Sequence, residues 1–328
     1  MMFGRRAALG AAAGCVVARG AAAQAARWQA ATGFADGNYH TRNLREFIAE
    51  VAQATEGGVT IQLHSNGSLM PQPQIKRGVQ TGQIQLGEIL LTAYGNEDPF
   101  FDADAVPGLV QNLDDARRLA AVQAPFIEAR FARQGMMLLY MAPWPQVAIT
   151  ANQNLTDPAQ LRGLRLRSYS PISTRLATLL GATGTLVTAP EVPQAFSTGI
   201  IQAQLTTAPV AADTAVWDYS RYFINAAIAT SKNAVFVSRR AFEALPEAQR
   251  ALVLQAAARA GARGWQMASE AQAEAESRMR ARGVQVVDAT PALLAAIRTA
   301  GQTMIEEWAI RAGDDGRRML EAYRASRG

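Results

Sequence analysis

The sequence has few of the side chains on which metal sites and covalent catalysis most often depend. Among its 328 residues there is one cysteine, Cys15, and there are two histidines, His40 and His64, far apart in the sequence. No H-x-x-x-H pair or Gly-x-Ser-x-Gly motif is present. The acid pair Asp102 and Asp104 flanks apolar residues, so we expect a solvated loop there rather than a catalytic carboxylate pair. We therefore expect no metal site and no enzymatic activity.

Phosphate-binding glycine loops and the features of nucleic-acid binders are also missing. The sequence contains neither a P-loop nor a dinucleotide-type Gly-x-Gly-x-x-Gly motif. The net charge of +5 includes three arginines within residues 1–25, and without that segment it falls to +2. No basic block with interleaved aromatic residues follows. We therefore expect no cofactor and no nucleic-acid partner.

Residues 1–25 read as a signal peptide. Adjacent arginines at positions 5 and 6 precede the short apolar run Ala7–Ala18, and an Ala-Gln-Ala cleavage site ends at Ala25. The paired arginines are compatible with the twin-arginine export route but do not establish it. Lipid anchoring at Cys15 is the less favoured alternative. Cleavage after Ala25 leaves a chain without cysteine, which excludes disulfides and thiol chemistry.

The rest of the chain indicates an α/β protein with two lobes. Strand, helix and strand patterns follow one another with short links in residues 59–87, and a similar alternation recurs in residues 164–206. This order predicts helix-covered sheets with parallel strands. We expect lobes composed of residues 26–149 plus about 234–262, and of residues 150–233 plus about 263–328.

A long helix is predicted from Pro246 to Gly283. Proline suits a first helical turn, and an Ala-, Glu- and Arg-rich run follows it. At 1.5 Å per residue, such a helix is roughly 50 Å long and could brace both lobes. Gly261 and Gly264 are the positions where it could kink or split.

The stretch Gln160–Pro171, with the sequence QLRGLRLRSYSP, is the best candidate for ligand recognition. Two leucines alternate with Arg165 and Arg167, so a strand here buries leucines on one face and directs guanidinium groups from the other. The planar fork of arginine matches a carboxylate with two charge-assisted hydrogen bonds. The alternative is that both arginines lie on a solvated sheet face, and spacing alone favours that alternative.

The same stretch resembles the "DLKGLKIR" segment of TRAP (tripartite ATP-independent periplasmic) transporter solute-binding proteins of the DctP type. Four further segments resemble that family in the same order, and together they extend the resemblance over most of the chain: VTIQLHSNGSL (59–69), GVQTGQIQLGE (78–88), LLGATGTLVTAPEVPQAFSTGIIQA (179–203) and SKNAVFVSRRAFEALP (231–246).

The resemblance implies a fold, a location and partners. The fold is the two-lobed, type II-like periplasmic binding protein fold, with a mixed sheet flanked by helices in each lobe and a long C-terminal helix bracing both. The protein is then a periplasmic carrier of a small organic acid. It delivers the acid to the small and large membrane subunits of a TRAP transporter and needs no cofactor. We expect a monomer.

The resemblance also assigns ligand-binding roles. Arg167 occupies the position of the arginine that clamps the ligand carboxylate, with Tyr169 beside it, while Arg165 falls at a surface position. Where the family often has "VDGQENP", this chain has IQAQLTT, so Thr206 replaces a ligand-facing asparagine and Gln204 keeps the glutamine.

The chain departs from the family where many members carry a second arginine in "GFR". Its stretch Ala142–Val147, APWPQV, offers Trp144 and Gln146 but no cation. Without that charge a second ligand carboxylate is disfavoured, and an indole adds a flat apolar wall.

Further aromatic and polar residues are candidates for the same site. With Phe34, Tyr94 and Trp217, the aromatic residues favour a monocarboxylate with a hydrophobic or aromatic body, or a hydroxy acid. Core packing is the alternative for each aromatic residue. Three polar residues could reach hydroxyl or carbonyl groups of the ligand: Glu88, Asn38 and Asn233. For Glu88 a structural ion pair is the alternative.

Two rival functions remain open at this point. One is an exported binding protein for an ABC importer or a sensor, which would share the fold. The other is a periplasmic hydrolase or isomerase that uses Glu88 or His64 as a base. A structural or adhesion role lacks the repeats and β-rich pattern that it requires.

Overall fold

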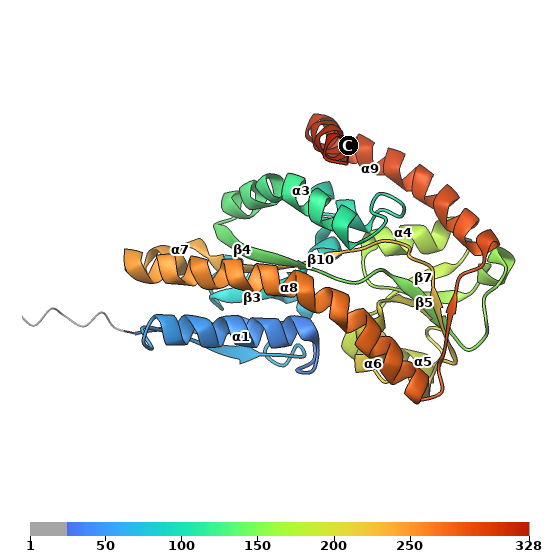
Figure 1. Cartoon of the computed structure of the whole chain (residues 1–328), viewed down its shortest axis with the longest axis horizontal. Helices are drawn as coiled ribbons and strands as arrows, with labels where there is room; N and C mark the ends of the chain where they lie inside the picture. Colours follow the sequence, from blue (N-terminus) through green and yellow to red (C-terminus); the bar gives the residue numbers. More distant parts are fainter. Residues whose placement is uncertain (1–24, 328) are drawn as a thin grey trace, which may run out of the picture.

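The structure is a computed structural model that describes residues 25–327. The expected signal peptide, with Cys15, lies outside the described residues except for Ala25. The described chain forms two β-sheets with helices packed around each (Figure 1). No helix between residues 25 and 327 combines the length and apolar character that a membrane span requires.

The first sheet has five strands and forms the centre of the first lobe. Its spatial order is β2 (Val59–His64), β1 (Ala26–Ala31), β3 (Leu86–Leu90), β10 (Lys232–Ser238) and β4 (Met136–Pro143). The strands β2, β1 and β3 are parallel, whereas β10 is antiparallel to both of its neighbours. The sheet is therefore mixed, and a strand from late in the chain lies in its interior.

Apolar stripes on the helices explain how the first sheet is covered. Helix α1 (Tyr39–Ala54) buries Leu44, Phe47 and Val51 at i, i+3 and i+7 in the core that also contains Val59 of β2. Helices α2 (Gln72–Gln80) and α3 (Leu113–Arg133) contribute to a separate core. The short helix α7 (Arg239–Glu243) follows β10.

The second sheet has six strands and forms the centre of the second lobe. Its order is β11 (Gln285–Asp288), β9 (Tyr222–Asn225), β5 (Ala148–Ala151), β8 (Ala203–Thr206), β6 (Arg165–Ser168) and β7 (Thr183–Leu186). The helices α4 (Pro171–Leu179), α5 (Val192–Ser197) and α6 (Ala208–Asp213) connect its strands. Strand β6 is parallel to β7 and β8, and Arg167 pairs in register with Thr185 and Gln204.

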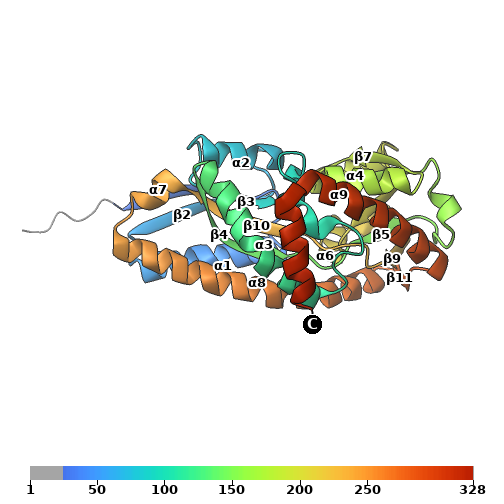
Figure 2. The same ribbon diagram turned by 90° about the horizontal axis from the view of Figure 1, so that it is seen from above.

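Helix α8 (Glu247–Ala281) connects the two lobes, as predicted. It packs against α1 and β4 in the first lobe and against α6 and β11 in the second (Figure 1, orange; Figure 2). Its 35 residues make it roughly 50 Å long. The helix continues through Gly261 and Gly264 without a break. Gly264 serves close packing, because a Cβ there would lie 2.6 Å from Cβ of Ala142 in β4.

Helix α9 (Pro291–Ala325) also contacts both lobes. It packs against α4 and α3, with a kink at Gly313, whose φ is 59° (Figure 2, red). The indole nitrogen of Trp308 donates to the Pro99 carbonyl over 2.7 Å, and the Tyr323 hydroxyl donates to the Leu109 carbonyl over 3.0 Å. The long C-terminal helices thus hold the lobes together.

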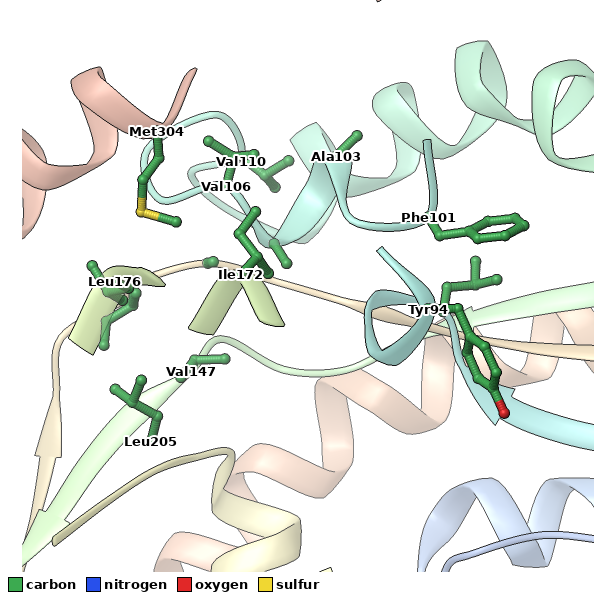
Figure 3. Packing of buried hydrophobic residues seen from close by; sticks show 14 of the residues in the cluster. Tyr94, Phe101, Ala103, Val106, Val110, Val147, Ile172, Leu176, Leu205 and Met304 are labelled. Carbon is green, nitrogen blue, oxygen red and sulfur yellow. The ribbon is translucent and has the colours of Figure 1, made fainter. Parts of the chain in front are cut away.

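One hydrophobic cluster extends from the first lobe into the second. Phe101 and Val106 follow β3, whereas Ile172 and Leu205 belong to α4 and β8, and Met304 of α9 completes the contact (Figure 3). The two lobes therefore share part of their core in addition to their helices.

The acids after β3 are buried, and our expectation of a solvated loop was wrong. Asp102 and Asp104 are each 1% exposed. Asp104 accepts a hydrogen bond from the buried Lys232 ammonium over 2.7 Å, and Asp102 pairs with Arg311 over 3.2 Å. Both cations come from remote parts of the chain, so the local pattern around the acids gave no sign of them.

Two of the lobe boundaries that we expected fall inside strands. Boundaries at 149/150 and 233/234 cut β5 and β10, since residues 148–151 pair in the second sheet and residues 232–238 in the first. The chain passes between the sheets in residues 144–147 and 226–231. The division of the whole chain into two lobes stays a proposal.

The close approach at Gly264 predicts a destabilised variant. Gly264→Ala should lower the free energy of unfolding by about 1–3 kcal/mol, because the clash with Ala142 exceeds the gain in helix propensity of about 1 kcal/mol. Gly261→Ala is the matched control, since its Cβ would lie 3.3 Å from Tyr140 and needs little adjustment. Urea unfolding measures both variants. Equal stability of Gly264→Ala and wild type would contradict the packing argument.

Burial of Asp102 predicts a pH-dependent stability. Burial raises the pKa of this carboxyl from its ordinary 3.8 to about 7, although Arg311 acts in the opposite direction. A carboxyl whose pKa is raised in the folded state contributes most to the free energy of unfolding at acidic pH, and this contribution is lost as the pH rises towards 7. The free energy of unfolding of Asp102→Asn, minus that of wild type, should therefore increase between about pH 4.5 and about pH 8. A difference that stays constant or decreases with rising pH would contradict this prediction.

Candidate functional site

A cavity lies between the two lobes at the ends of strands from both sheets. Its volume is about 180 Å³. The first lobe contributes residues after β1, β3 and β4, and the second contributes the ends of β6, β7 and β8. The residues around it are Phe34, Gln72, Pro73, Leu90, Ala93, Tyr94, Trp144, Arg167, Tyr169, Ser170, Pro171, Leu186, Val187, Thr188, Ala189, Thr206, Thr207, Val210 and Ser231. Strand ends are the usual place for ligands in α/β proteins.

Arg167 is a buried cation at the edge of this cavity. Only 4% of the residue is exposed. Its Nε donates to the Val187 carbonyl over 2.9 Å, and its Nη1 donates to the Leu205 carbonyl over 2.8 Å. Within residues 25–327, no carboxylate lies within ion-pairing distance of its guanidinium group. Since arginine has five N–H donors, three remain for a ligand.

The electrostatic state of Arg167 follows from this burial. Desolvation lowers the pKa of the guanidinium to about 10, and the Tyr169 and Tyr219 hydroxyls act in the opposite direction. The group therefore stays protonated at neutral pH. Burial raises the pKa of the Tyr169 hydroxyl, which stays neutral beside it. Burying a charge without a counter-ion costs free energy, so an anionic ligand that pairs with Arg167 would reduce this cost.

The N-terminus of α4 reinforces the positive potential at this end of the cavity. Ser170 caps the helix by accepting a hydrogen bond from the Ser173 backbone N–H over 3.3 Å, and Pro171 occupies the first helical position. Both Ser170 and Pro171 line the cavity. The positive end of a helix dipole favours anions nearby. It therefore adds to the charge of Arg167.

Aromatic side chains form another wall of the cavity. Trp144 and Phe34 lie with their ring centroids 4.9 Å apart. The Trp144 indole donates to Oδ1 of Asn233 over 2.7 Å, which fixes the orientation of its ring. The Tyr94 hydroxyl donates to the Gln72 carbonyl over 3.1 Å. This wall offers flat apolar surface with its hydrogen-bonding groups already satisfied.

Residues with hydroxyl side chains also line the cavity. They are Thr206, Thr207, Thr188 and Ser231, of which Thr188 donates its hydroxyl to the Glu191 carboxylate. The Thr207 hydroxyl is buried and has no hydrogen-bond partner within the described chain. A buried hydroxyl without a partner is unfavourable, so a polar ligand atom would fit there.

The structure places five of the predicted site residues at the cavity. They are Arg167, Tyr169, Trp144, Thr206 and Tyr94, and the aromatic candidate Phe34 lies there as well. Six others lie outside its lining: Gln146, Gln204, Glu88, Asn38, Trp217 and Asn233.

Two of the six, Asn233 and Glu88, accept hydrogen bonds from other buried side chains. Asn233 holds the Trp144 indole. Glu88, 1% exposed, accepts from the Thr32 hydroxyl over 2.6 Å and lies 3.5 Å from Nδ1 of His40. Burial lowers the pKa of His40 even beside this acid. Glu88 thus has structural partners, Thr32 and His40, neither of which is a lysine or arginine.

The other four have different contacts. Asn38 caps α1 and bonds to Asp213 of the second lobe. The Trp217 ring lies beneath the Arg282 guanidinium, with 5.2 Å between the ring centroid and Cζ of Arg282. Gln146 donates to the Gln111 carbonyl. Gln204 is fully buried within the second sheet.

The sequence gave no signal for several residues that line the cavity. Leu186 ends β7, Val187 and Ala189 follow it, and Val210 lies in α6. Aliphatic residues at these positions look like ordinary core residues. The resemblance covered the first three, within residues 179–203, but assigned no role to them.

Comparison with known proteins identifies the family. The model of the bacterial extracellular solute-binding protein family 7, DctP, matches residues 31–311. The chain belongs to this family. It is a TRAP solute-binding protein of the DctP type, and such proteins carry small organic acids rather than act as enzymes.

Solved structures of similar proteins share the fold. DctP7, a Bordetella pertussis extracytoplasmic solute receptor binding pyroglutamic acid, is 39% identical to this solute-binding protein, with a TM-score of 0.90 over 92% of this chain and 100% of that one. A marine metagenome TRAP solute-binding protein specific for pyroglutamate is 29% identical, with a TM-score of 0.90 over 92% and 99% of the two chains. A solute-binding protein of Albidiferax ferrireducens is 20% identical over 67% of this chain and 66% of its own length.

Proposed function

We propose that this protein captures a small monocarboxylate in the cavity between its lobes, with Arg167 as the carboxylate clamp. The protein is exported to the periplasm, and its ligand-loaded form delivers the acid to the small and large membrane subunits of a TRAP transporter. No particular observation favours the ABC-importer alternative. The hydrolase alternative is not favoured either, since its candidate bases, Glu88 and His64, do not line the cavity.

The observation that carries this proposal is the buried, unpaired guanidinium of Arg167. Its two backbone contacts fix the direction of the fork but do not neutralise its charge. A ligand carboxylate would supply the missing charge and accept the remaining N–H groups. Exclusion of water by closure of the lobes would strengthen this ion pair.

The rest of the lining supports a single carboxylate on a compact body. Arg167 is the only lysine or arginine among the described residues around the cavity. A second ligand carboxylate would therefore be desolvated without a cation. The volume of about 180 Å³ is below the roughly 300–1,000 Å³ typical of drug-sized ligand sites. Aliphatic and aromatic side chains cover most of the remaining surface.

Pyroglutamate is the ligand that fits these features and the relatives together. It has one carboxylate on a small ring, and its lactam N–H and C=O need hydrogen-bond partners. The unpartnered Thr207 hydroxyl and the nearby Ser231 and Tyr169 hydroxyls can supply them. Two relatives that bind pyroglutamic acid are 39% and 36% identical to this chain. Aromatic and hydroxy monocarboxylates are the alternative ligands.

Removing the guanidinium should abolish tight binding. Arg167→Ala should raise the Kd for pyroglutamate by 30-fold to several thousand-fold, on the order of 2–5 kcal/mol, because the bound carboxylate is left buried and unpaired. Arg167→Lys should bind with intermediate affinity, since it keeps the charge but loses the fork. Isothermal titration calorimetry measures these constants.

Arg165→Ala is the matched control for this experiment. Arg165 lies on the same strand two residues earlier, is exposed, and donates to the Gly199 carbonyl outside the cavity. Its replacement should leave the Kd unchanged. Undiminished binding by Arg167→Ala, or equal losses in both variants, would refute the clamp.

The single cation also predicts the ligand range. In a thermal-shift screen of small carboxylates, pyroglutamate and other compact monocarboxylates should raise the melting temperature. Dicarboxylic acids should not, because Arg167 is the one lysine or arginine that the described residues place around the cavity, so a second carboxylate has no cation to pair with. Sialic-acid-like sugars should not, because their bulky bodies do not fit a volume of about 180 Å³. A shift produced only by di-acids or by sialic-acid-like sugars would show that the assignment to compact monocarboxylates is wrong.

A further inference from the structure

Asn38 and Asp213 form a polar contact directly between the lobes, away from the proposed clamp. Asn38 precedes α1 in the first lobe, and Asp213 ends α6 in the second. The Asn38 Nδ2 donates to Oδ2 of Asp213 over 2.7 Å. The Asn38 residue is 2% exposed and the Asp213 side chain 15%, so the bond is largely shielded from water.

The backbone fixes the direction of the Asn38 side chain. Its Oδ1 accepts from the His40 backbone N–H over 3.0 Å and so caps α1. With the oxygen held in this way, the amide nitrogen must point away from the helix, where it needs an acceptor. Asp213 is the acceptor that the second lobe provides.

Asp213 is in turn anchored to the long helix that connects the lobes. Its Oδ1 lies 3.8 Å from an Nη1 of Arg278 in α8. Arg42 and Glu274 form a further ion pair close by, with 3.8 Å between Nη2 and Oε2. The contact thus joins the loop before α1, helix α6 and helix α8.

The bridge also lines a second cavity that adjoins the ligand cavity. This second cavity, of about 230 Å³, is lined by Asn38 and Asp213, and it shares Phe34, Ala189 and Val210 with the ligand cavity. The bridging side chains themselves do not line the ligand cavity. They can therefore change how long the lobes stay closed without changing what the cavity recognises.

We propose that the Asn38–Asp213 hydrogen bond is a latch that holds the two lobes closed over the ligand, which makes both residues positioning residues for ligand capture. This role rests on the proposed function for its ligand. Breaking the bond destabilises the closed form, so ligand should leave faster. The relative affinities for different monocarboxylates should stay the same.

Exchanging donor and acceptor tests the latch. Asn38→Asp keeps an oxygen for the helix cap but places a second carboxylate against Asp213, so it should raise the dissociation rate of pyroglutamate about 10-fold, with a smaller change in the association rate. Combining it with Asp213→Asn restores one donor and one acceptor and should return the rate to within about threefold of wild type. Stopped-flow fluorescence measures both rates.

Asn38→Ser is the control for folding and for the cap. Serine still caps the helix but lacks the amide donor, so this variant should release ligand faster than wild type and slower than Asn38→Asp at an unchanged melting temperature. Wild-type dissociation rates in all variants would overturn the latch. So would a double variant that releases ligand as fast as Asn38→Asp.

A measurement without ligand separates failure of the latch from failure of the proposed ligand. Residues 26–328 contain no cysteine, so spin labels at Gln80→Cys in α2 and Thr178→Cys in α4, both exposed, report one interlobe distance. Short distances between the two labels, which correspond to closed lobes, should be less populated in Asn38→Asp than in wild type. The double variant should restore their population. If wild type does not bind pyroglutamate, the proposed ligand is wrong, and the distances still decide the latch. Equal distance distributions in wild type and Asn38→Asp would overturn it.

Discussion

The structure depends on one buried positive charge that the described chain leaves unpaired. Arg167 is held by carbonyl groups on two sides, one after β7 and one in β8, so its position follows from the register of three adjacent strands. Carbonyl oxygens fix the guanidinium but cannot compensate its charge. If Arg167 is the clamp that we propose, the cost of orienting it is already met in the folded protein, and a carboxylate that enters the cavity would find an oriented partner.

The two lobes supply different parts of the site. The second lobe provides the cation, the start of α4 and most hydroxyl groups, whereas the first lobe provides the aromatic wall. Trp144 lies where the chain passes from one sheet to the other, and Asn233, at the start of the returning strand, fixes its indole. The apolar wall is thus attached to the connections between the lobes. In the proposed function, this arrangement would link movement of the lobes to enclosure of the ligand.

Contacts between the lobes are of two kinds. The long helices α8 and α9 and the hydrophobic cluster around Ile172 and Met304 form a broad and mainly apolar attachment, to which Trp308 and Tyr323 of α9 add hydrogen bonds (Figure 2, Figure 3). The Asn38–Asp213 bond is a single polar contact beside the cavity. Apolar attachment is not directional and tolerates small rotations, whereas a hydrogen bond needs one geometry. This difference suits a binding protein that must both hold and release its ligand.

Much of the fold could be predicted from local patterns. The strand, helix and strand patterns in residues 59–87 predicted β2, α2 and β3. The long helix from Pro246 was expected, and its glycines do not interrupt it. What the pattern could not show was why Gly264 is there, because the close approach of Ala142 comes from a strand far away in the sequence.

The sequence by itself determined the α/β class and the long connecting helix, and through a family resemblance it made Arg167 the candidate for the proposed clamp. It could not distinguish Arg165 from Arg167 by spacing, because both side chains leave the same strand on the same face. Only the tertiary structure decided that one is exposed and the other buried. It also decided that Glu88 and Asn38 face protein partners and that Thr207 faces the cavity. Burial and partners depend on which remote segments meet, and local periodicity contains no information about that.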